Sequence, residues 1–249
     1  MDAAIATTSS NSNNTGTASI TTSASNTGTG AGLTIYVARH GQDKDNAAGI
    51  LNGHRDQPLT ELGKEQAQTV AAKILERGLT FDAIYASPLQ RAFETAKIIL
   101  KAQTQSTSTL SSSNWEVVQM DALIERDFGI LTGTPTSEIP TRVPANDMLV
   151  TDTINYFLSP QGAETFPQLK ERGKAVLEEL DKKHNDSASS TILLVTHGDF
   201  GKMLYAAFYD LDWKATLQQF HFGNSELILL SRKSSPEQAH VFQIQQYNA

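Results

Sequence analysis

Hydrophobic residues along the chain form short runs that are apolar almost throughout and longer runs with a helical period. Two of the short runs, residues 33–38 and 191–195, end abruptly at a His-Gly pair. Apolar runs of this length that contain many β-branched residues are typical of strands buried on both faces of a parallel sheet. The sequence therefore predicts two central strands, which deliver His40-Gly41 and His197-Gly198 at their carboxyl ends.

The longer runs predict helices that alternate with further strands. We predict helices over residues 60–78, 87–101, 163–183 and 199–209, and further strands over 81–86, 115–120, 225–230 and 241–247. This alternation predicts an α/β fold, a three-layer sandwich with helices on both faces of a mostly parallel sheet. The last two strands flank a polar loop that contains Pro236, which favours an antiparallel edge of this sheet.

Three segments interrupt this alternation. Residues 1–32 consist almost wholly of Ser, Thr, Asn, Gly and Ala, and they are predicted to be a disordered tail because they cannot bury enough apolar surface. Residues 33–249 then form one domain. Residues 103–114 are predicted to be a polar surface loop, and residues 131–162, which contain several prolines, an irregular segment.

Composition narrows the possible classes of protein. The chain has 249 residues and a formal net charge of −7 with no basic run, which argues against a nucleic-acid partner. It contains no cysteine, so disulfides, thiolate zinc sites and thiol nucleophiles are excluded. No apolar stretch approaches a membrane span and the tail lacks a signal peptide's basic region, so we expect a cytoplasmic protein without a membrane partner. The oligomeric state stays open.

The two His-Gly pairs are the first candidates for chemistry. In α/β sheets, ligands bind beyond the carboxyl ends of the strands, so two strands could place His40 and His197 across one pocket. The alternative interpretation is that two ordinary histidines close two core strands. Two histidines in the same context, one of them directly preceded by Arg39, favour a chemical role over this alternative.

Four blocks of sequence resemble the motifs of one known family. Residues 39–46 resemble the Arg-His-Gly-x-x-x-x-Asn motif of the histidine phosphatase superfamily, in its phosphoglycerate-mutase-like branch. Residues 87–92, 123–129 and 196–198 resemble later blocks and follow in the family's order. The resemblance covers nearly all of residues 33–249 and implies a phosphatase domain of this branch.

The resemblance implies a role for each residue of a phosphate site. His40 is the nucleophile that becomes phosphohistidine, which requires a neutral imidazole, and neighbouring cations favour that form. Arg39 holds phosphoryl oxygens, and His197 and the amide of Gly198 donate further hydrogen bonds to them. For each histidine, the alternative is a purely structural side chain.

Two charged residues of this site have competing interpretations. Arg91, near the start of a predicted helix, is expected to be a second phosphate clamp, and the alternative is a surface arginine paired with Glu94. Glu125 is expected to shuttle a proton to the leaving group and from water. Asp121 and Asp127 lie close to it in the sequence, and only the resemblance selects Glu125.

The resemblance also implies where substrate binds. Contacts are expected from Asn46, Asn52, Gly53, Gly198 and Glu164. Residues 134–160 lack the paired arginines with which mutases grip a second anionic group, Phe128 stands where mutases often have Tyr, and Lys202 stands where Arg is common. These departures argue against mutase activity.

The predicted function is hydrolysis of a small phosphorylated metabolite through phosphohistidine, with no cofactor and no metal ion. One alternative is a phosphoglycerate or bisphosphoglycerate mutase. Another is a phosphoprotein-directed phosphatase or a binding module. We expect residues 131–162 to lie over the pocket and to set the specificity for the substrate.

Overall fold

The computed structural model describes residues 32–106, 115–152, 154–184 and 190–242. Residues 1–31, which hold almost all of the predicted disordered tail, lie outside the described residues. The same holds for residues 107–114 of the predicted surface loop and for residues 243–247 of the last predicted strand.

Within the described residues, the main sheet has six strands in the order β3-β2-β6-β1-β7-β8. They are β1 (Leu33–Arg39), β2 (Ala83–Ala86), β3 (Val118–Gln119), β6 (Ser190–Thr196), β7 (Leu227–Leu230) and β8 (His240–Phe242). The pairs among β1, β2, β3 and β6 are parallel, whereas β7 pairs antiparallel with both β1 and β8. The prediction of a mostly parallel sheet with an antiparallel edge is confirmed.

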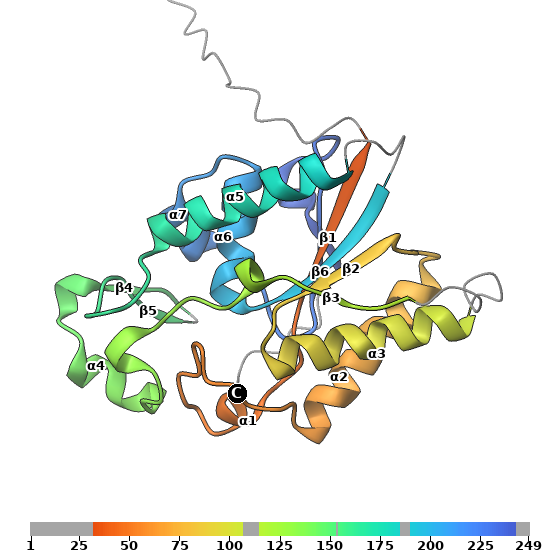
Figure 1. Cartoon of the computed structure of the whole chain (residues 1–249). Coiled ribbons are helices and arrows are strands. Elements are labelled where there is room, and N and C mark those ends of the chain that lie inside the picture. Colours follow the sequence, from red (N-terminus) through yellow and green to blue (C-terminus); the bar gives the residue numbers. More distant parts are fainter. Residues whose placement is uncertain (1–31, 107–114, 153, 185–189, 243–249) are drawn as a thin grey trace, which may run out of the picture.

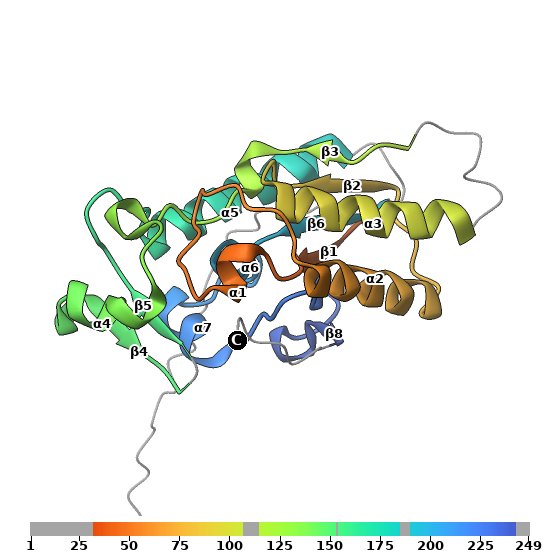
Figure 2. The same ribbon diagram turned by 90° about the horizontal axis from the view of Figure 1, so that it is seen from below.

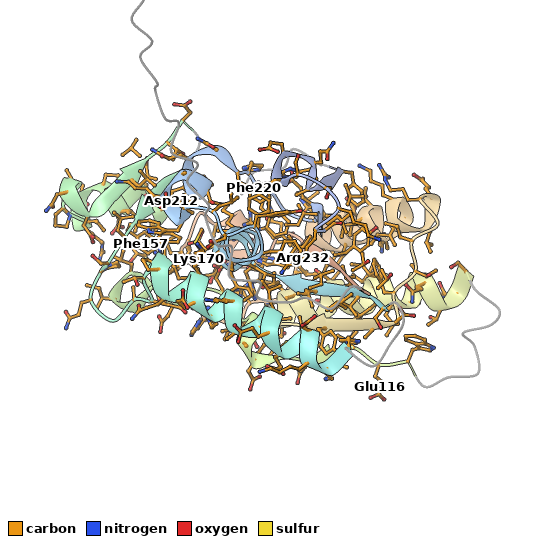
Figure 3. The ribbon with its side chains drawn as sticks, turned by 90° about the horizontal axis from the view of Figure 1, so that it is seen from above. Glu116, Phe157, Lys170, Asp212, Phe220 and Arg232 are labelled. Atoms are coloured by element: carbon orange, nitrogen blue, oxygen red, sulfur yellow. The ribbon has the colours of Figure 1, made fainter. Side chains whose placement is uncertain are left out.

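Helices cover both faces of this sheet (Figure 1). They are α2 (Glu61–Glu76) and α3 (Gln90–Ser106) on one face, and α5 (Phe166–His184), α6 (Gly198–Phe208) and α7 (Trp213–Gln219) on the other. Ile35 and Val37 of β1 pack towards α5 and α6, whereas Tyr36 and Ala38 pack towards α2 and α3. The predicted three-layer sandwich is therefore confirmed, and side chains fill the space between its layers (Figure 3).

The buried side chain of Gln103 explains two differences from the predicted bounds. α3 continues to Ser106, so residues 103–106 are helical and do not belong to the predicted loop. Gln103 accepts a hydrogen bond from the Phe81 amide at 3.0 Å and donates one to the Phe81 carbonyl at 3.1 Å. This side chain takes up the backbone groups of Phe81, which therefore lies outside β2, and β2 begins at Ala83.

Residues 131–162 are more regular than predicted. They contain α4 (Ile139–Arg142) and an antiparallel pair of strands, β4 (Met148–Val150) and β5 (Asn155–Phe157), which forms a small second sheet. A separate small core packs beneath them, made of Phe128, Leu131, Ile139, Val143 and Phe157. Elements of three or four residues are too short to show a period in the sequence. Figure 2 shows them at the left end of the molecule, with α1 (Lys44–Ala47), which follows β1, between them and α2.

The other elements are short or begin late. α5 begins at Phe166 and not at residue 163, because Ala163 pairs with Phe128 in an isolated antiparallel bridge. The described part of the chain also has single turns of 3-10 helix at Asp121–Leu123, Gly129–Leu131, Thr136–Glu138, Ala145–Asp147 and Pro236–Gln238. No helix in this part is long and apolar enough to cross a membrane.

Candidate active site

A cavity of about 380 Å³ lies beyond the carboxyl end of β1, where the first His-Gly pair predicts a ligand. Its walls come from within residues 39–52, 125–128, 136–140 and 154–157, from the start of α6 and from His221. The small sheet therefore contributes to the wall, as expected for residues 131–162. A cavity of this volume suits a small metabolite.

β1 and β6 bring His40 and His197 together. The two strands are parallel neighbours with Arg39 opposite Thr196, so the residue that follows each strand lies at the same level. The two imidazole rings lie 5.0 Å apart between centroids, with their planes inclined by 61°. The prediction that the two strands bring both imidazoles together is confirmed, but of the two rings only His40 lines the cavity.

His40 is held as a neutral imidazole with one nitrogen available as a nucleophile. Its Nδ1 lies 2.6 Å from the carbonyl oxygen of Gly41, which can only accept a hydrogen bond, so the ring proton sits on Nδ1. Nε2 keeps its lone pair and lies 3.3 Å from Nε of Arg91. Burial, followed by the positive charges of Arg91 and Arg39, holds the pKa of His40 well below its ordinary value.

Arg91 lies at the start of α3 and contacts both histidines. Its Nε lies within hydrogen-bond distance of His40 Nε2 and 3.2 Å from His197 Nδ1. Its Nη1 and Nη2 donate to the backbone carbonyls of Arg55 and Gly53, at 2.7 and 2.8 Å, which fixes the plane of the guanidinium. The side chain is 0% exposed, so its interpretation as a surface arginine is wrong.

His197 is oriented by Ser87, whose Oγ lies 2.7 Å from His197 Nε2. Because Nδ1 faces the N–H of Arg91, Nδ1 accepts and the ring proton sits on Nε2. Burial and the charge of Arg91 hold the pKa of His197 well below its ordinary value, so this ring is neutral as well. Its predicted role as a donor to phosphoryl oxygens requires Nδ1 to take up a proton.

Arg39 lines the cavity and is fixed by neighbouring backbone. Its Nη1 donates to the carbonyl of Phe222 at 3.0 Å. Gly198, which also lines the cavity, lies against the guanidinium, and a Cβ at this position would lie 3.2 Å from Cζ of Arg39. The glycine therefore allows the guanidinium to lie across the first turn of α6.

Glu125 lines the cavity and is held by three backbone amides. Its carboxylate accepts hydrogen bonds from the amides of Arg126 at 2.8 Å, Phe200 at 3.1 Å and Asp199 at 3.3 Å. The first turn of α6 thus binds this carboxylate. Burial, followed by the negative charge of Asp199, raises the pKa of Glu125, which suits a group that must both donate and accept a proton.

Only Glu125 among the three neighbouring carboxyl groups lines the cavity. Asp121 is exposed, and Asp127 is partly exposed and accepts a hydrogen bond from the amide of Gly129 at 2.8 Å. Spacing alone could not select among them, because a non-repeating loop conformation decides which side chain turns inward.

Glu164, a predicted substrate contact, lies outside the cavity wall. Its carboxylate accepts two hydrogen bonds from Arg172, at 3.0 and 2.8 Å. Arg172 in turn donates to the backbone carbonyls of Ala122, Ile124 and Glu125, at 2.8, 2.7 and 3.3 Å. Glu164 therefore helps to hold the segment that carries Glu125, and Arg172, which the motifs did not single out, is the link.

Asp43 is a buried carboxylate that sequence reasoning missed, because it falls at a variable position of the first motif. It accepts hydrogen bonds from the amide of Asn46 and from Nδ2 of Asn52, both at 2.7 Å, and lies 3.2 Å from Nε of Arg91. Of the predicted substrate contacts in this region, Asn46 and Asn52 line the cavity. Gly53 does not, and its carbonyl accepts a hydrogen bond from Arg91.

Further residues of the cavity wall were not predicted to be site residues. Among them are Arg126, Tyr156, Asp199, Lys202 and His221. Arg126 directly follows Glu125, and Lys202 follows the second His-Gly pair. The positive charges of Arg126 and Lys202 were visible in the sequence. Charge alone does not distinguish a cation in a cavity wall from a cation on the surface.

Comparison with known proteins identifies the family. The family model of the histidine phosphatase superfamily (branch 1) matches residues 35–245. The chain belongs to this superfamily. The resemblance in the four motif blocks is therefore confirmed, and the chain is a phosphoric monoester hydrolase of the histidine phosphatase type.

Relatives of this histidine phosphatase include mutases and phosphatases. It is 30% identical over 190 residues, 75% of the chain and 86% of the relative, to a 2,3-bisphosphoglycerate-dependent phosphoglycerate mutase of Bartonella henselae. It is 31% identical to a metal-independent phosphoserine phosphatase of Arabidopsis thaliana over 171 residues, which cover 69% of this chain and 66% of the relative. A phosphoserine phosphatase of Entamoeba histolytica, solved with 3-phosphoglyceric acid, superposes with a TM-score of 0.62 at 25% identity, over 79% and 89% of the chains.

Proposed function

We propose that this histidine phosphatase hydrolyses a small phosphorylated metabolite through a phosphohistidine on His40, without a metal ion. The observation that carries the proposal is the contact between Nδ1 of His40 and the Gly41 carbonyl, which leaves Nε2 unprotonated beside Arg91. A neutral imidazole next to guanidinium groups suits attack on phosphorus, because the guanidinium groups stabilise the charge on the phosphoryl oxygens.

The reaction has two half-reactions. In the first, Nε2 of His40 attacks phosphorus, the bond from phosphorus to the ester oxygen breaks, and Glu125 donates its proton to that oxygen. In the second, the Glu125 carboxylate takes a proton from water, the water oxygen attacks phosphorus, and the phosphorus–nitrogen bond breaks to release phosphate. Arg39 and Arg91 hold the phosphoryl oxygens through both steps.

The residues of the site favour a reaction without a metal ion. Among the described residues, no group of three or more His, Asp or Glu side chains is placed to hold one. Arg39 and Arg91 supply positive charge where a metal ion would otherwise balance the phosphoryl group. The name of the Arabidopsis relative also describes a metal-independent enzyme.

A mutase is the second candidate, because the Bartonella relative is a mutase. Residues 134–160 contain one arginine, Arg142, in the place where mutases grip a second anionic group. Its side chain is 52% exposed, pairs with Glu138 at 2.6 Å and does not line the cavity. This placement favours hydrolysis.

A phosphatase screen in excess EDTA tests the proposal. O-phosphoserine, 3-phosphoglycerate and sugar phosphates are supplied, and release of phosphate and formation of 2-phosphoglycerate are measured. We expect phosphate release and an acid-labile, base-stable phosphoryl group on the protein, both absent from His40→Ala. Full turnover by His40→Ala would exclude the phosphohistidine, and formation of 2-phosphoglycerate without phosphate release would assign the chain to the mutases.

A further inference from the structure

Two cations of the cavity wall have no place in the reaction described above. Lys202 on α6 is 2% exposed and Arg126 is 0% exposed, and both line the cavity. Both contact β5, through Tyr156 and the carbonyl of Phe157, whereas Arg91 lies beside His40. These two cations are therefore associated with the small sheet.

Lys202 has no negative partner in the described part of the chain. Its Nζ donates a hydrogen bond to Oη of Tyr156 at 2.8 Å and lies 5.0 Å from the centre of that ring. None of the described carboxylates lies within 4.0 Å of it. A buried charge without a partner is costly, so its retention in a cavity wall indicates that a ligand supplies the partner.

Arg126 is only partly balanced. Its one ion pair among the described residues is with Asp199, at 3.5 Å from Nε. Nη2 donates to the carbonyl of Phe157 at 2.9 Å, and the guanidinium lies 4.1 Å from the centre of the Phe166 ring. Nη1 is buried and has no hydrogen-bond acceptor. The wall beside β5 therefore has more positive charge than its contacts balance.

Neighbouring groups do not remove this excess. Burial, together with the charge of Lys202, lowers the pKa of His221 to about 4, so His221 is neutral at physiological pH and does not change the charge of this wall. Asp199 is already in contact with Arg126. The hydroxyl of Tyr156 accepts from Lys202, and its own proton is available for a second acceptor in the cavity.

We infer that Lys202, with Arg126 and Tyr156, binds a second anionic group on the substrate, a carboxylate or a second phosphate. The inference rests on the proposed function and names the substrate class: small phosphomonoesters with a further negative charge. Binding pairs a charge that is otherwise buried alone, and the low local dielectric strengthens the contact.

Pairs of substrates that differ by one anionic group test this inference. O-phosphoserine differs from phosphoethanolamine by a carboxylate, and fructose 1,6-bisphosphate differs from fructose 6-phosphate by a phosphate. We expect kcat/KM of the wild-type enzyme to favour the more anionic member of at least one pair by about tenfold or more, as a charge-assisted hydrogen bond allows. The pair with the larger ratio tells whether a carboxylate or a phosphate is recognised.

Variants show whether Lys202 carries this preference. Lys202→Met should bring the ratio close to one, Lys202→Arg should keep most of it, and Tyr156→Phe should reduce it. Lys214→Met removes an exposed lysine and should leave the ratio as it is in the wild type. Thermal melting of each variant reports whether it is folded. If Lys202→Met does not fold, the substrate ratio of Tyr156→Phe tests the inference in its place.

The outcomes separate this inference from the proposed function. Hydrolysis of p-nitrophenyl phosphate with a wild-type ratio near one for both pairs would overturn the inference alone. An equal loss on both members of each pair in folded Lys202→Met would also overturn it. If no ester is hydrolysed and His40 acquires no phosphoryl group, the proposed function fails and the inference fails with it.

Discussion

Nε of Arg91 lies 3.2 Å from the Asp43 carboxylate, and both side chains are fully buried. The same Nε lies within hydrogen-bond distance of the His40 nitrogen proposed to attack phosphorus. Asp43 therefore balances the charge of Arg91 when the site is empty. It also places a negative charge close to the phosphoryl group when the site is filled, so it should weaken phosphate binding.

Asp43→Asn should therefore bind phosphate more tightly. The amide keeps an oxygen that can accept from the amide of Asn46 but removes the charge that opposes a phosphate dianion. We expect the inhibition constant of inorganic phosphate to fall about threefold to tenfold, a change of roughly 1 kcal/mol. Weaker inhibition would mean that Asp43 acts mainly by positioning Arg91.

Glu125→Gln tests the proposed proton shuttle. The amide cannot donate the proton that an alkoxide leaving group needs, so turnover of an alkyl phosphate should fall by about 10²–10⁴-fold. The loss should be smaller with p-nitrophenyl phosphate if phosphorylation of the enzyme limits the rate, because this leaving group scarcely needs a proton. Asp127→Asn is the control and should show no such dependence on the leaving group.

Asp199→Asn should shift the pH dependence of kcat. Burial and then the charge of Asp199 raise the pKa of Glu125, so removal of that charge lowers this pKa. The proton donor is then lost at lower pH, and the alkaline limb of kcat for an alkyl phosphate moves to lower pH. Asp210→Asn, at a fully exposed carboxylate, controls for net charge and should leave the limb in place. A limb that moves to higher pH would contradict the assignment of Glu125 as the acid.

The centre of the site was predictable because it depends on regular structure. A buried strand followed by His-Gly places the histidine at the end of the sheet, and the parallel register of β1 and β6 brings His40 and His197 together. Two short apolar runs, each followed by a His-Gly pair, are sufficient for that inference. The same reasoning placed Arg91 at the start of a helix near this edge.

The outer layer of the site was not predictable, because it depends on contacts between loops. The resemblance implies that Glu164 contacts the substrate, yet its carboxylate accepts a hydrogen bond from Arg172, and no periodicity in the sequence indicates that pairing. Asp43 occupies a variable motif position, and its role depends on the distance to Arg91. The small sheet is built from three-residue strands, which carry no readable period.

The end of α3 illustrates the same limit and provides a test of stability. The polar tract that begins at Gln103 predicts a loop. In the structure, however, the side chain of Gln103 is buried and forms hydrogen bonds with both the amide and the carbonyl of Phe81. Gln103→Ala leaves this amide and carbonyl without partners inside the protein, so the free energy of unfolding should fall by about 1–3 kcal/mol. Gln105→Ala makes the same change at an exposed position of the same helix and should alter it by less than about 0.5 kcal/mol. Urea unfolding of both variants measures the difference, and equal losses would show that helix propensity, and not the contact with Phe81, is what Gln103 contributes.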